Sequence, residues 1–413
     1  MAVSRREWLQ GMGAVAVGAS LPVGAVSLPS ALRDFPRKDD FNITPGFTYL
    51  NGAYTHPMPR AAAEASQRVA TRRSTLSPPT GAQYSRPGGD PRSAFASLIN
   101  AKPSELSLIP NTSTGENLVV EALGISGGGD YNVVTDGLHF DGSLVHLFEL
   151  KKRGLDLRVV TPREGRIEMA DLERVVDNKT RLVEISLVAM YNGFQHDLKA
   201  VCDLAHAHGA YVYADIIQAA GAVPIDVRAS GVDFAATASY KWLMGDFGIG
   251  FLYVREDLLD RVVHRTHWSY ESAPDADIHQ SPFDPQHGQV VTYTPGTTAA
   301  EYFQLGTMDY TALAALGVSI PYVLSLGVEN IQRYRQPMID KLQKEMPRLG
   351  YTPQTPAGST SPIVTFAHKD ADGITKKLTN ARVEVRVAPY WMRIAPSVYN
   401  DLQDVDRLLE ALS

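Results

Sequence analysis

The feature that most constrains the fold is an alternation of short apolar segments with helix-like segments between residues 106 and 254. The apolar segments have the length of strands, for example LSLIP at 106–110 and AYVYADI at 210–216. The segments between them, such as LKAVCDLAHAHG at 198–209, have the spacing of amphipathic helices. Strands that are apolar on both faces and joined by helices form parallel sheets with helices on either side. The sequence therefore predicts an α/β fold built on a large, mostly parallel sheet.

The pattern changes after a loop-rich stretch at 270–298. A long helical segment is followed by short strands and a final helix, which is typical of a smaller α+β domain. With 413 residues, the chain has the length for such a division. We therefore expect an N-terminal segment at 28–60, a large domain at 61–310 and a small C-terminal domain at 311–413.

The first 27 residues have the pattern of a twin-arginine export signal. Arg5 and Arg6 precede Trp8 and a weakly apolar stretch rich in glycine, alanine and valine. This stretch is too short and too rich in glycine for a stable membrane span, and it lacks the polar face of an ordinary amphipathic helix. We expect export to the periplasm by the twin-arginine machinery, with no membrane span in the mature form. Since that route carries folded proteins, a bound cofactor is the expected reason for it.

Composition excludes several classes of function. The chain is 44% hydrophobic and 20% charged, and its formal net charge is −6, which argues against nucleic acid or an anionic membrane as the main partner. Cys202 is the only cysteine, so an intramolecular disulfide and a multi-cysteine metal site are excluded. Its place on the apolar stripe of a helix predicts core packing. We predict no metal site, because His206 and His208 fit the last turn of that helix.

Polar residues follow several of the predicted strands. Parallel sheets bind ligands beyond the carboxyl ends of their strands, so these residues are expected to lie near one another. NTSTG at 111–115 follows the first strand and provides hydroxyl groups and free amides at the start of a helix, which suits a phosphate; plain helix capping is the alternative. Asp215 ends one central strand, and Lys241 follows the next. A buried lysine and a buried carboxylate are both costly unless they are paired or used chemically.

This set of groups matches the needs of pyridoxal phosphate. Lys241 would form an imine with the cofactor, and Asp215 would keep the pyridine nitrogen protonated. Gln218 would donate a hydrogen bond to the ring phenolate, and His139 would stack on the ring. The hydroxyl groups and amides of the 111–115 turn would bind the phosphate group.

The segment from Tyr213 to Asp257 resembles the class V aminotransferase family, whose members have the fold-type I architecture of pyridoxal-phosphate enzymes. The matching features are D-x-x-Q at Asp215 and Gln218, V-D at Val232 and Asp233, and a lysine followed by G-x-G at Gly248 and Gly250. YLNGAY near the N-terminus and RIAPSVYNDLQDVDRLLEAL at the C-terminus resemble the family's opening and closing segments. The resemblance therefore extends over nearly the whole chain after the predicted signal.

The resemblance implies further site residues. It places Thr112 and Ser113 on the cofactor phosphate and Ser239 and Tyr240 at the cofactor. It also makes Phe140 the alternative to His139 as the stacking residue. Asn192 is the expected substitute for a family asparagine, because Met190 occupies that position. Thr307 is expected to reach the phosphate of a neighbouring subunit, which implies a homodimer with active sites at the interface. The expected substrate-binding residues are Arg386, Ala53 and Trp268, and Arg393 is expected to be structural.

The resemblance leaves the reaction open. The sequence is most similar to the isopenicillin N epimerase-like branch of the family. This resemblance implies an enzyme that acts on the amino group of an amino acid or a derivative by aminotransferase, epimerase or lyase chemistry. The alternatives are a carbon–sulfur lyase or cysteine desulfurase-like enzyme, and a catalytically idle binding protein on the same fold. The loop before Arg386 contains no cysteine, and Tyr240 stands where desulfurases have histidine. Both features argue against a desulfurase mechanism.

Overall fold

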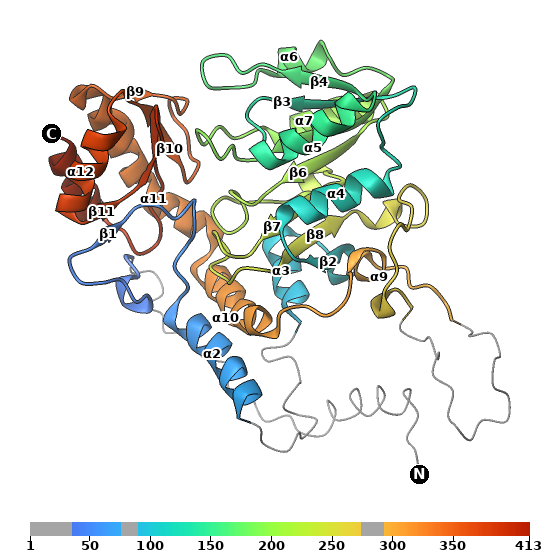
Figure 1. The fold of residues 1–413 in the computed structure, drawn as a ribbon, viewed down its shortest axis with the longest axis horizontal. Helices are drawn as coiled ribbons and strands as arrows, with labels where there is room; N and C mark the ends of the chain where they lie inside the picture. Colours follow the sequence, from blue (N-terminus) through green and yellow to red (C-terminus); the bar gives the residue numbers. More distant parts are fainter. Residues whose placement is uncertain (1–34, 76–89, 274–292) are drawn as a thin grey trace.

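The computed structural model describes residues 35–75, 90–273 and 293–413. The predicted export signal at 1–27 lies outside the described residues, as does the beginning of the predicted N-terminal segment. The structure has two parts that lie side by side: a large sheet with its helices, and a smaller unit formed by the C-terminal elements (Figure 1).

The described residues form strands, α-helices and short 3-10 helices with the following bounds. The strands are β1 (Thr48–Tyr49), β2 (Leu106–Ile109), β3 (Asn132–Asp136), β4 (Asp156–Val160), β5 (Thr180–Ser186), β6 (Tyr211–Asp215), β7 (Phe234–Ala238), β8 (Gly250–Val254), β9 (Thr352–Pro353), β10 (Val364–Ala367), β11 (Val383–Glu384), β12 (Arg386–Val387) and β13 (Trp391–Ile394). The α-helices are α2 (Arg60–Ser74), α3 (Pro91–Ile99), α4 (Thr112–Ala122), α5 (Asp141–Lys152), α6 (Met169–Glu173), α7 (Leu198–Ala207), α8 (Val227–Ser230), α9 (Ala299–Phe303), α10 (Tyr310–Leu326), α11 (Val328–Glu345), α12 (Ala371–Ala381) and α13 (Leu402–Leu412). The short 3-10 helices are η3 (Lys38–Asp40), η5 (Pro103–Glu105), η6 (Glu256–Leu258), η7 (Tyr270–Ser272) and η8 (Met346–Leu349).

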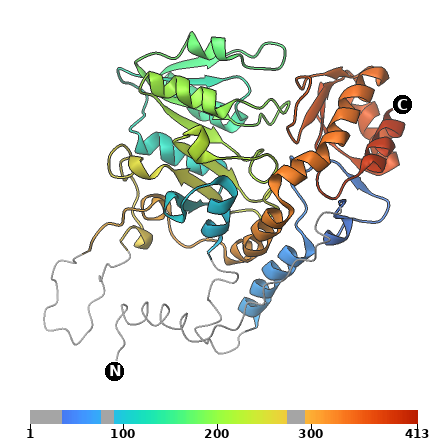
Figure 2. The ribbon, with the colours of Figure 1, turned by 180° about the vertical axis from the view of Figure 1, so that it is seen from behind.

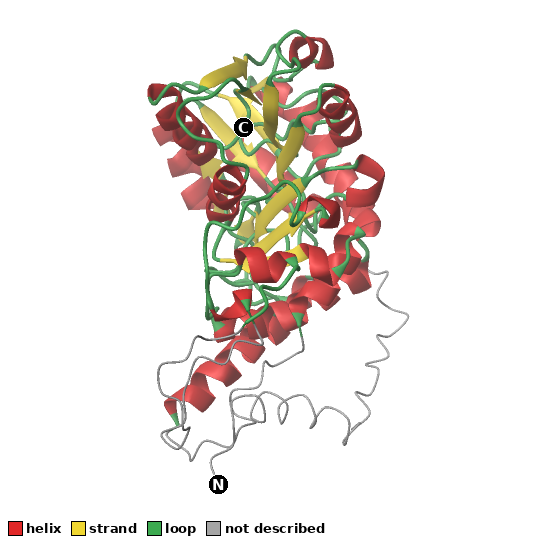
Figure 3. Cartoon of the chain, turned by 90° about the vertical axis from the view of Figure 1, so that its right-hand side faces the viewer, coloured by secondary structure: helices red, strands yellow, loops and turns green. Residues whose placement is uncertain are grey.

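The large sheet has seven strands in the order β2-β8-β7-β6-β5-β3-β4. The pairs from β7 to β4 are parallel, whereas β8 runs antiparallel to both of its neighbours, β2 and β7. The prediction of a mostly parallel sheet is therefore confirmed. The strands lie between helices in the side view (Figure 3).

Two hydrophobic cores cover the two faces of this sheet. One core combines strand residues such as Val134, Val183 and Val212 with residues of α3, α6, α7 and α10. The other combines their neighbours Val133, Leu182 and Tyr213 with residues of α4, α5 and α9. Adjacent strand residues thus point to opposite cores, as the pleat requires, and both faces are apolar.

The smaller unit has its own sheet and core. Its four-stranded antiparallel sheet has the order β12-β13-β10-β9, and its core includes residues of α11, α12 and α13. The helices and strands of this unit are drawn in orange and red in Figure 2. Helix α10 differs from these helices, because Ala312, Leu316 and Ile320 join the core of the large sheet and the helix packs along α2. The predicted boundary at residues 310 and 311 thus falls at the start of a helix that belongs to the large core.

Within the described ranges, no single helix is long and apolar enough to span a membrane.

Candidate active site

A cavity of about 850 Å³ lies where the carboxyl ends of the large-sheet strands face the smaller unit. The large sheet and its loops contribute most of its walls, and β12 and β13 contribute Arg386, Trp391 and Arg393. Predicted site residues in its lining are Ala53, Thr112, Ser113, Asp215, Gln218, Tyr240, Lys241 and Arg386. The topology brings these residues together from positions more than 300 apart in the sequence.

Lys241 is the amine of this cavity. It follows β7 in a turn, and only 7% of the residue is exposed. Burial lowers the pKa of Lys241 to about 8; the negative charge of Asp215 opposes this shift, and the positive charge of Arg393 adds to it. About a tenth of the amine is therefore uncharged at pH 7 and about half at pH 8, and the uncharged form is the nucleophile.

Asp215 ends β6 and is the buried acid of the cavity. It accepts hydrogen bonds from the backbone N–H of Ile217 at 2.9 Å and from the hydroxyl of Ser186 at 3.5 Å. Burial raises the pKa of Asp215, and the N–H of Ile217 and the charges of His139 and Lys241 act in the opposite direction.

The N-terminus of α4 forms one end of the cavity. Asn111 caps the helix by accepting from the N–H of Thr114 at 2.9 Å. The hydroxyl of Thr112 is buried and has no hydrogen-bond partner within the described part of the chain. A Cβ at Gly115 would lie 2.7 Å from the Cδ1 of Ile109, so only glycine allows α4 this close to the sheet. The free donors at this helix end suit a phosphate group.

Taken together, these residues fit pyridoxal phosphate. Lys241 supplies the amine, Asp215 the acid for a ring nitrogen, and the unpartnered Thr112 hydroxyl a donor for a phosphate oxygen. Tyr240 lies half-buried beside Lys241, with its ring stacked on Phe247 at 4.7 Å between centroids. Phe247 also lines the cavity, and no sequence pattern indicated it.

Gln218 is held by two hydrogen bonds. Its Nε2 donates to the carbonyl of Ala53 at 2.9 Å, and its Oε1 accepts from the indole N–H of Trp242 at 2.9 Å. One hydrogen of the Nε2 group therefore stays available for a ligand in the cavity.

Three predicted cofactor contacts, His139, Asn192 and Ser239, lie outside the lining of this cavity. The lining contains Phe140 instead of His139, whose Nδ1 lies 2.9 Å from the Ser186 hydroxyl. Asn192 lies outside the lining because its side chain donates to the carbonyls of Gly165 and Gln354 and accepts from the N–H of Phe194; Met190 lines the cavity instead. Ser239 also lies outside, since its hydroxyl donates to the carbonyl of Asp246.

Arg393 differs from its expected structural role. It is buried in the lining, its Nη1 donates to the carbonyl of Met190 at 2.9 Å, and its Nε has no hydrogen-bond partner among the described residues. Burial, aided by the charge of Arg386, lowers the pKa of Arg393 to about 10. Arg386 is exposed and lies over the ring of Tyr54 at 5.7 Å. Arg393 is therefore the better-positioned cation for a buried carboxylate; its place at the start of the closing RIAPSVYN segment was the available signal.

Thr307 and Trp268 lie outside the cavity of their own chain. Both are exposed, and the hydroxyl of Thr307 lies 3.1 Å from that of Tyr270. Cys202 lies buried in α7, where burial raises the pKa of its thiol to about 12. The prediction of core packing for Cys202 is confirmed.

Residues 74–408 match the family model described as aminotransferase class-V. The chain belongs to the aminotransferase class-V family. Members with similar sequences include a cysteine desulfurase of Escherichia coli strain K12, 30% identical over 339 residues that cover 76% of this chain and 79% of that protein. A probable cysteine desulfurase of Methanothermobacter thermautotrophicus is 30% identical over 252 residues; this match covers 61% of the present chain and 59% of that relative.

Two solved structures show the same fold as this class V chain. The apo cysteine desulfurase of Thermococcus onnurineus NA1 has a TM-score of 0.77 at 21% identity, with 91% of this chain and 97% of that chain covered. The cystine C–S lyase C-DES, in complex with its reaction product cysteine persulfide, has a TM-score of 0.76 at 20% identity, with 89% and 97% covered. The predicted fold-type I architecture is thereby confirmed.

Proposed function

We propose that this class V chain is a pyridoxal-phosphate enzyme that cleaves a carbon–sulfur bond in an α-amino acid substrate. The observation that carries the proposal is Lys241, a buried amine whose pKa is lowered to about 8 in a cavity that also contains Asp215 and Arg393. The relatives named as desulfurases and the fold shared with a cystine lyase favour sulfur chemistry within the family.

The residues of the cavity divide the work between binding and proton transfer. Bound pyridoxal phosphate supplies a protonated ring that accepts the electron pair left at the substrate α-carbon. Thr112, Ser113 and the N-terminus of α4 would hold its phosphate, and Asp215 would hold the proton on its ring nitrogen. Phe140 and the apolar lining exclude water from the ring face.

The substrate is held by charge and deprotonated by an amine. Arg393 binds the α-carboxylate with its free Nε–H, and Arg386 adds a second positive charge at the entrance. Lys241 in its uncharged form then takes the α-proton at its Nζ. The Cβ–S bond breaks with its electron pair on sulfur. After addition of one water, the remaining products are ammonia and a 2-oxo acid.

The sulfur leaves without being carried on a cysteine of this chain. Cys202 is the only thiol of the sequence, and it is buried in α7 with its pKa raised to about 12. This feature favours release of sulfide or of a small persulfide, as opposed to transfer of sulfur to a protein thiol. The chemistry named for the cystine lyase fits that requirement.

A transaminase or epimerase of the isopenicillin N epimerase-like type is the second candidate. The S-Y-K sequence at 239–241 and the absence of a cysteine before Arg386 favour it over a desulfurase. Transamination moves the amino group to the cofactor, and epimerisation returns the proton on the opposite face. Both begin with the same proton transfer to Lys241.

The products of three incubations distinguish these reactions. The holoenzyme is incubated with L-cystine, L-cysteine or L-alanine in deuterated water. The proposal expects persulfide or sulfide, ammonia and pyruvate from a sulfur substrate, with Cys202→Ala as active as the wild type. Racemised, deuterated alanine or pyruvate without ammonia would favour the second candidate. Loss of sulfur release in Cys202→Ala would contradict the proposed route.

We also propose a homodimer and export to the periplasm. The exposed positions of Thr307 and Trp268 support the dimer, since both are available to a second subunit. The twin-arginine pattern at Arg5 and Arg6 supports export.

A further inference from the structure

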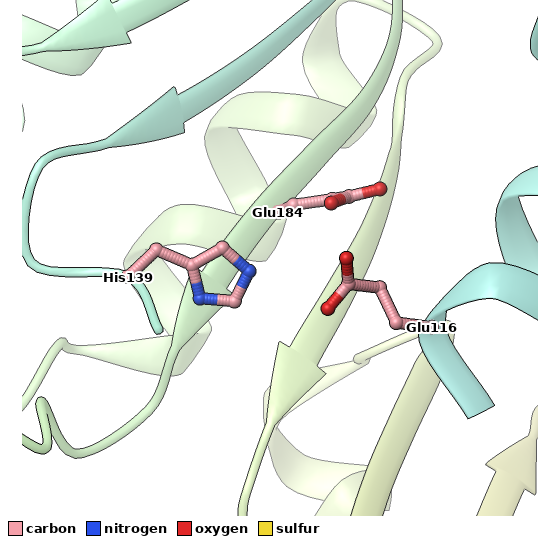
Figure 4. Close-up of side chains that lie close together, drawn as sticks. All are labelled: Glu116, His139 and Glu184. Carbon is pink, nitrogen blue, oxygen red and sulfur yellow. The ribbon is translucent and has the colours of Figure 1, made fainter. Parts of the chain in front are cut away.

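A cluster of three buried ionisable residues lies behind the cavity. Glu116 of α4, Glu184 of β5 and His139 after β3 bring one ligand-type atom each within 4.8 Å of one another (Figure 4). All three are buried. Among the described residues, His139 Nε2, Glu116 Oε1 and both carboxyl oxygens of Glu184 have no hydrogen-bond partner. Two carboxyl groups and an imidazole thus face one another in a place where unpaired charge is costly.

A polar line connects this cluster to the acid of the active site. Glu184 and Ser186 are two residues apart on one face of β5, and the register pairs Ser186 with Asp215 on β6. His139 Nδ1 lies 2.9 Å from the Ser186 hydroxyl, which donates to Asp215 Oδ2 at 3.5 Å. A hydroxyl has one proton, so Nδ1 is the donor to Ser186 when that proton is directed at Asp215.

The surroundings of the two glutamates differ. Glu116 accepts a hydrogen bond from the Ser143 hydroxyl, a donor that stabilises a negative charge, and its Oε1 lies 3.5 Å from His146 Nδ1. Glu184 has none in the described structure, and burial together with the charge of Glu116 raises its pKa well above the usual range. Glu184 is therefore the carboxyl group that stays neutral.

We propose that ionised Glu116 and neutral Glu184 hold His139 in its protonated form, and that His139 acts through Ser186 to keep Asp215 ionised beneath the cofactor. The inference rests on the proposed function, since Asp215 matters through the ring nitrogen. The cluster then carries one negative and one positive charge, and its net charge is zero. A neutral buried cluster avoids much of the cost of an unpaired charge. Glu116, Glu184, His139 and Ser186 are positioning residues.

Other titratable groups that face this line come from every neighbouring element. They are His146 of α5, Asp136 of β3 with its partner His196, Tyr213 and Asp215 of β6, and Lys241 after β7. Asp136 is paired with His196, and the charges of Asp136 and Asp215 also interact with His139. Glu116 and Glu184 are the carboxyl groups that face His139 in Figure 4.

Nitrogen-15 spectra of the holoenzyme test the proposal. Histidine labelled with ¹⁵N reports the protonation of His139, assigned by its loss in His139→Gln, and cofactor labelled at its ring nitrogen reports the proton held by Asp215. We expect both nitrogens of His139 to carry protons at pH 7.5. Glu116→Gln should deprotonate His139 and lower the pH at which the ring nitrogen loses its proton by about one unit or more. Glu184→Gln should leave both signals unchanged, because Glu184 is already neutral.

Two further variants keep the test decisive. Ser186→Ala leaves the charges in place but interrupts the line, so it should move the ring-nitrogen signal and leave His139 protonated. Glu105→Gln is the matched control, since Glu105 is equally buried and pairs with Arg228 elsewhere; it should move neither signal. Should Glu116→Gln fail to fold, the wild-type His139 signal and Ser186→Ala still decide.

Three results would overturn the inference: a neutral His139 in the wild type, equal effects of Glu116→Gln and Glu184→Gln, or one metal ion per chain that is retained after dialysis against EDTA. A protein that binds no pyridoxal phosphate would instead contradict the proposed function. The His139 signal can be read in that case as well.

Discussion

At the scale of single residues, the pKa of Lys241 gives the first prediction. Burial lowers this pKa from 10.5 to about 8, so the uncharged amine becomes the major form above about pH 8. The rate at which the apoprotein combines with pyridoxal phosphate should therefore rise with pH and level off above about pH 8. Stopped-flow measurement of the visible absorbance checks this profile. A rate that still rises steeply up to pH 10, as for an exposed lysine such as Lys199, would contradict the assigned environment.

The two arginines of the cavity give the second prediction. Arg393 is buried with a free Nε–H, whereas Arg386 is exposed over Tyr54. Lysine keeps the positive charge but lacks the planar guanidinium and its Nε–H. Losing a hydrogen bond to a charged group costs about 1.5–3 kcal/mol, so Arg393→Lys should lower kcat/KM by about tenfold or more. Arg386→Lys should cost about fivefold or less, because this exposed position keeps its charge in the variant. Steady-state kinetics of both variants on the same substrate measure the difference. A larger loss for Arg386→Lys would show that Arg386 is the main substrate-binding arginine, as expected from the sequence.

Residue roles were predictable where the fold fixes the direction of a side chain. Lys241 and Asp215 follow or end apolar strands, and the carboxyl ends of such strands meet at one edge of the sheet. His139, Asn192 and Ser239 lie in loops or turns, where no periodicity indicates which side chain faces a cavity. Phe140 and Met190 line the cavity instead. Long-range contacts, such as the hydrogen bond of Asn192 to Gln354, determine which side chain of such a loop faces the cavity.

At the scale of elements, the N-terminus of α4 gives the third prediction. Thr112→Val keeps the volume of the side chain and removes its unpartnered hydroxyl. The loss of one hydrogen bond to a charged group, worth about 1.5–3 kcal/mol, should raise the dissociation constant for pyridoxal phosphate by at least about tenfold. The apoprotein should be no less stable, because an unsatisfied buried group is removed.

Thr114→Val is the matched control for this helix end. The Thr114 hydroxyl donates to the Asn111 side chain at 3.1 Å and does not line the cavity. Fluorescence titration with the cofactor and thermal unfolding of both variants provide the comparison. Equal affinities for the two variants would contradict a phosphate contact at Thr112.

The elements also differ in how well the sequence predicts them. Apolar runs are sufficient to predict the parallel strands from β3 to β7, and helix periodicity is sufficient to predict α7. The antiparallel direction of β8 was not predictable, because an apolar strand reads the same in either direction. The place of α10 was not predictable either, since its apolar residues suit either core and only the contacts with α2 and the large sheet decide.

At the scale of the whole molecule, the export signal gives the fourth prediction. Replacing Arg5 and Arg6 with lysines should retain the protein in the cytoplasm, because the twin-arginine route depends on that pair. Arg72 and Arg73, an adjacent arginine pair at the end of α2, provide the matched control, and their replacement should not affect export. Cell fractionation followed by immunoblotting measures both. Periplasmic recovery of the Arg5 and Arg6 variant would contradict the prediction.

The measurement that most directly tests the whole account is borohydride fixation of the cofactor. The purified protein should be yellow, and reduction should bleach the visible band and attach the cofactor covalently to one peptide, the one that contains Lys241. Lys241→Ala should give no modified peptide while it retains the fold, as judged by circular dichroism. Mass spectrometry of the digested protein identifies the site. A colourless protein, or a cofactor attached to a lysine other than Lys241, would contradict the central claim.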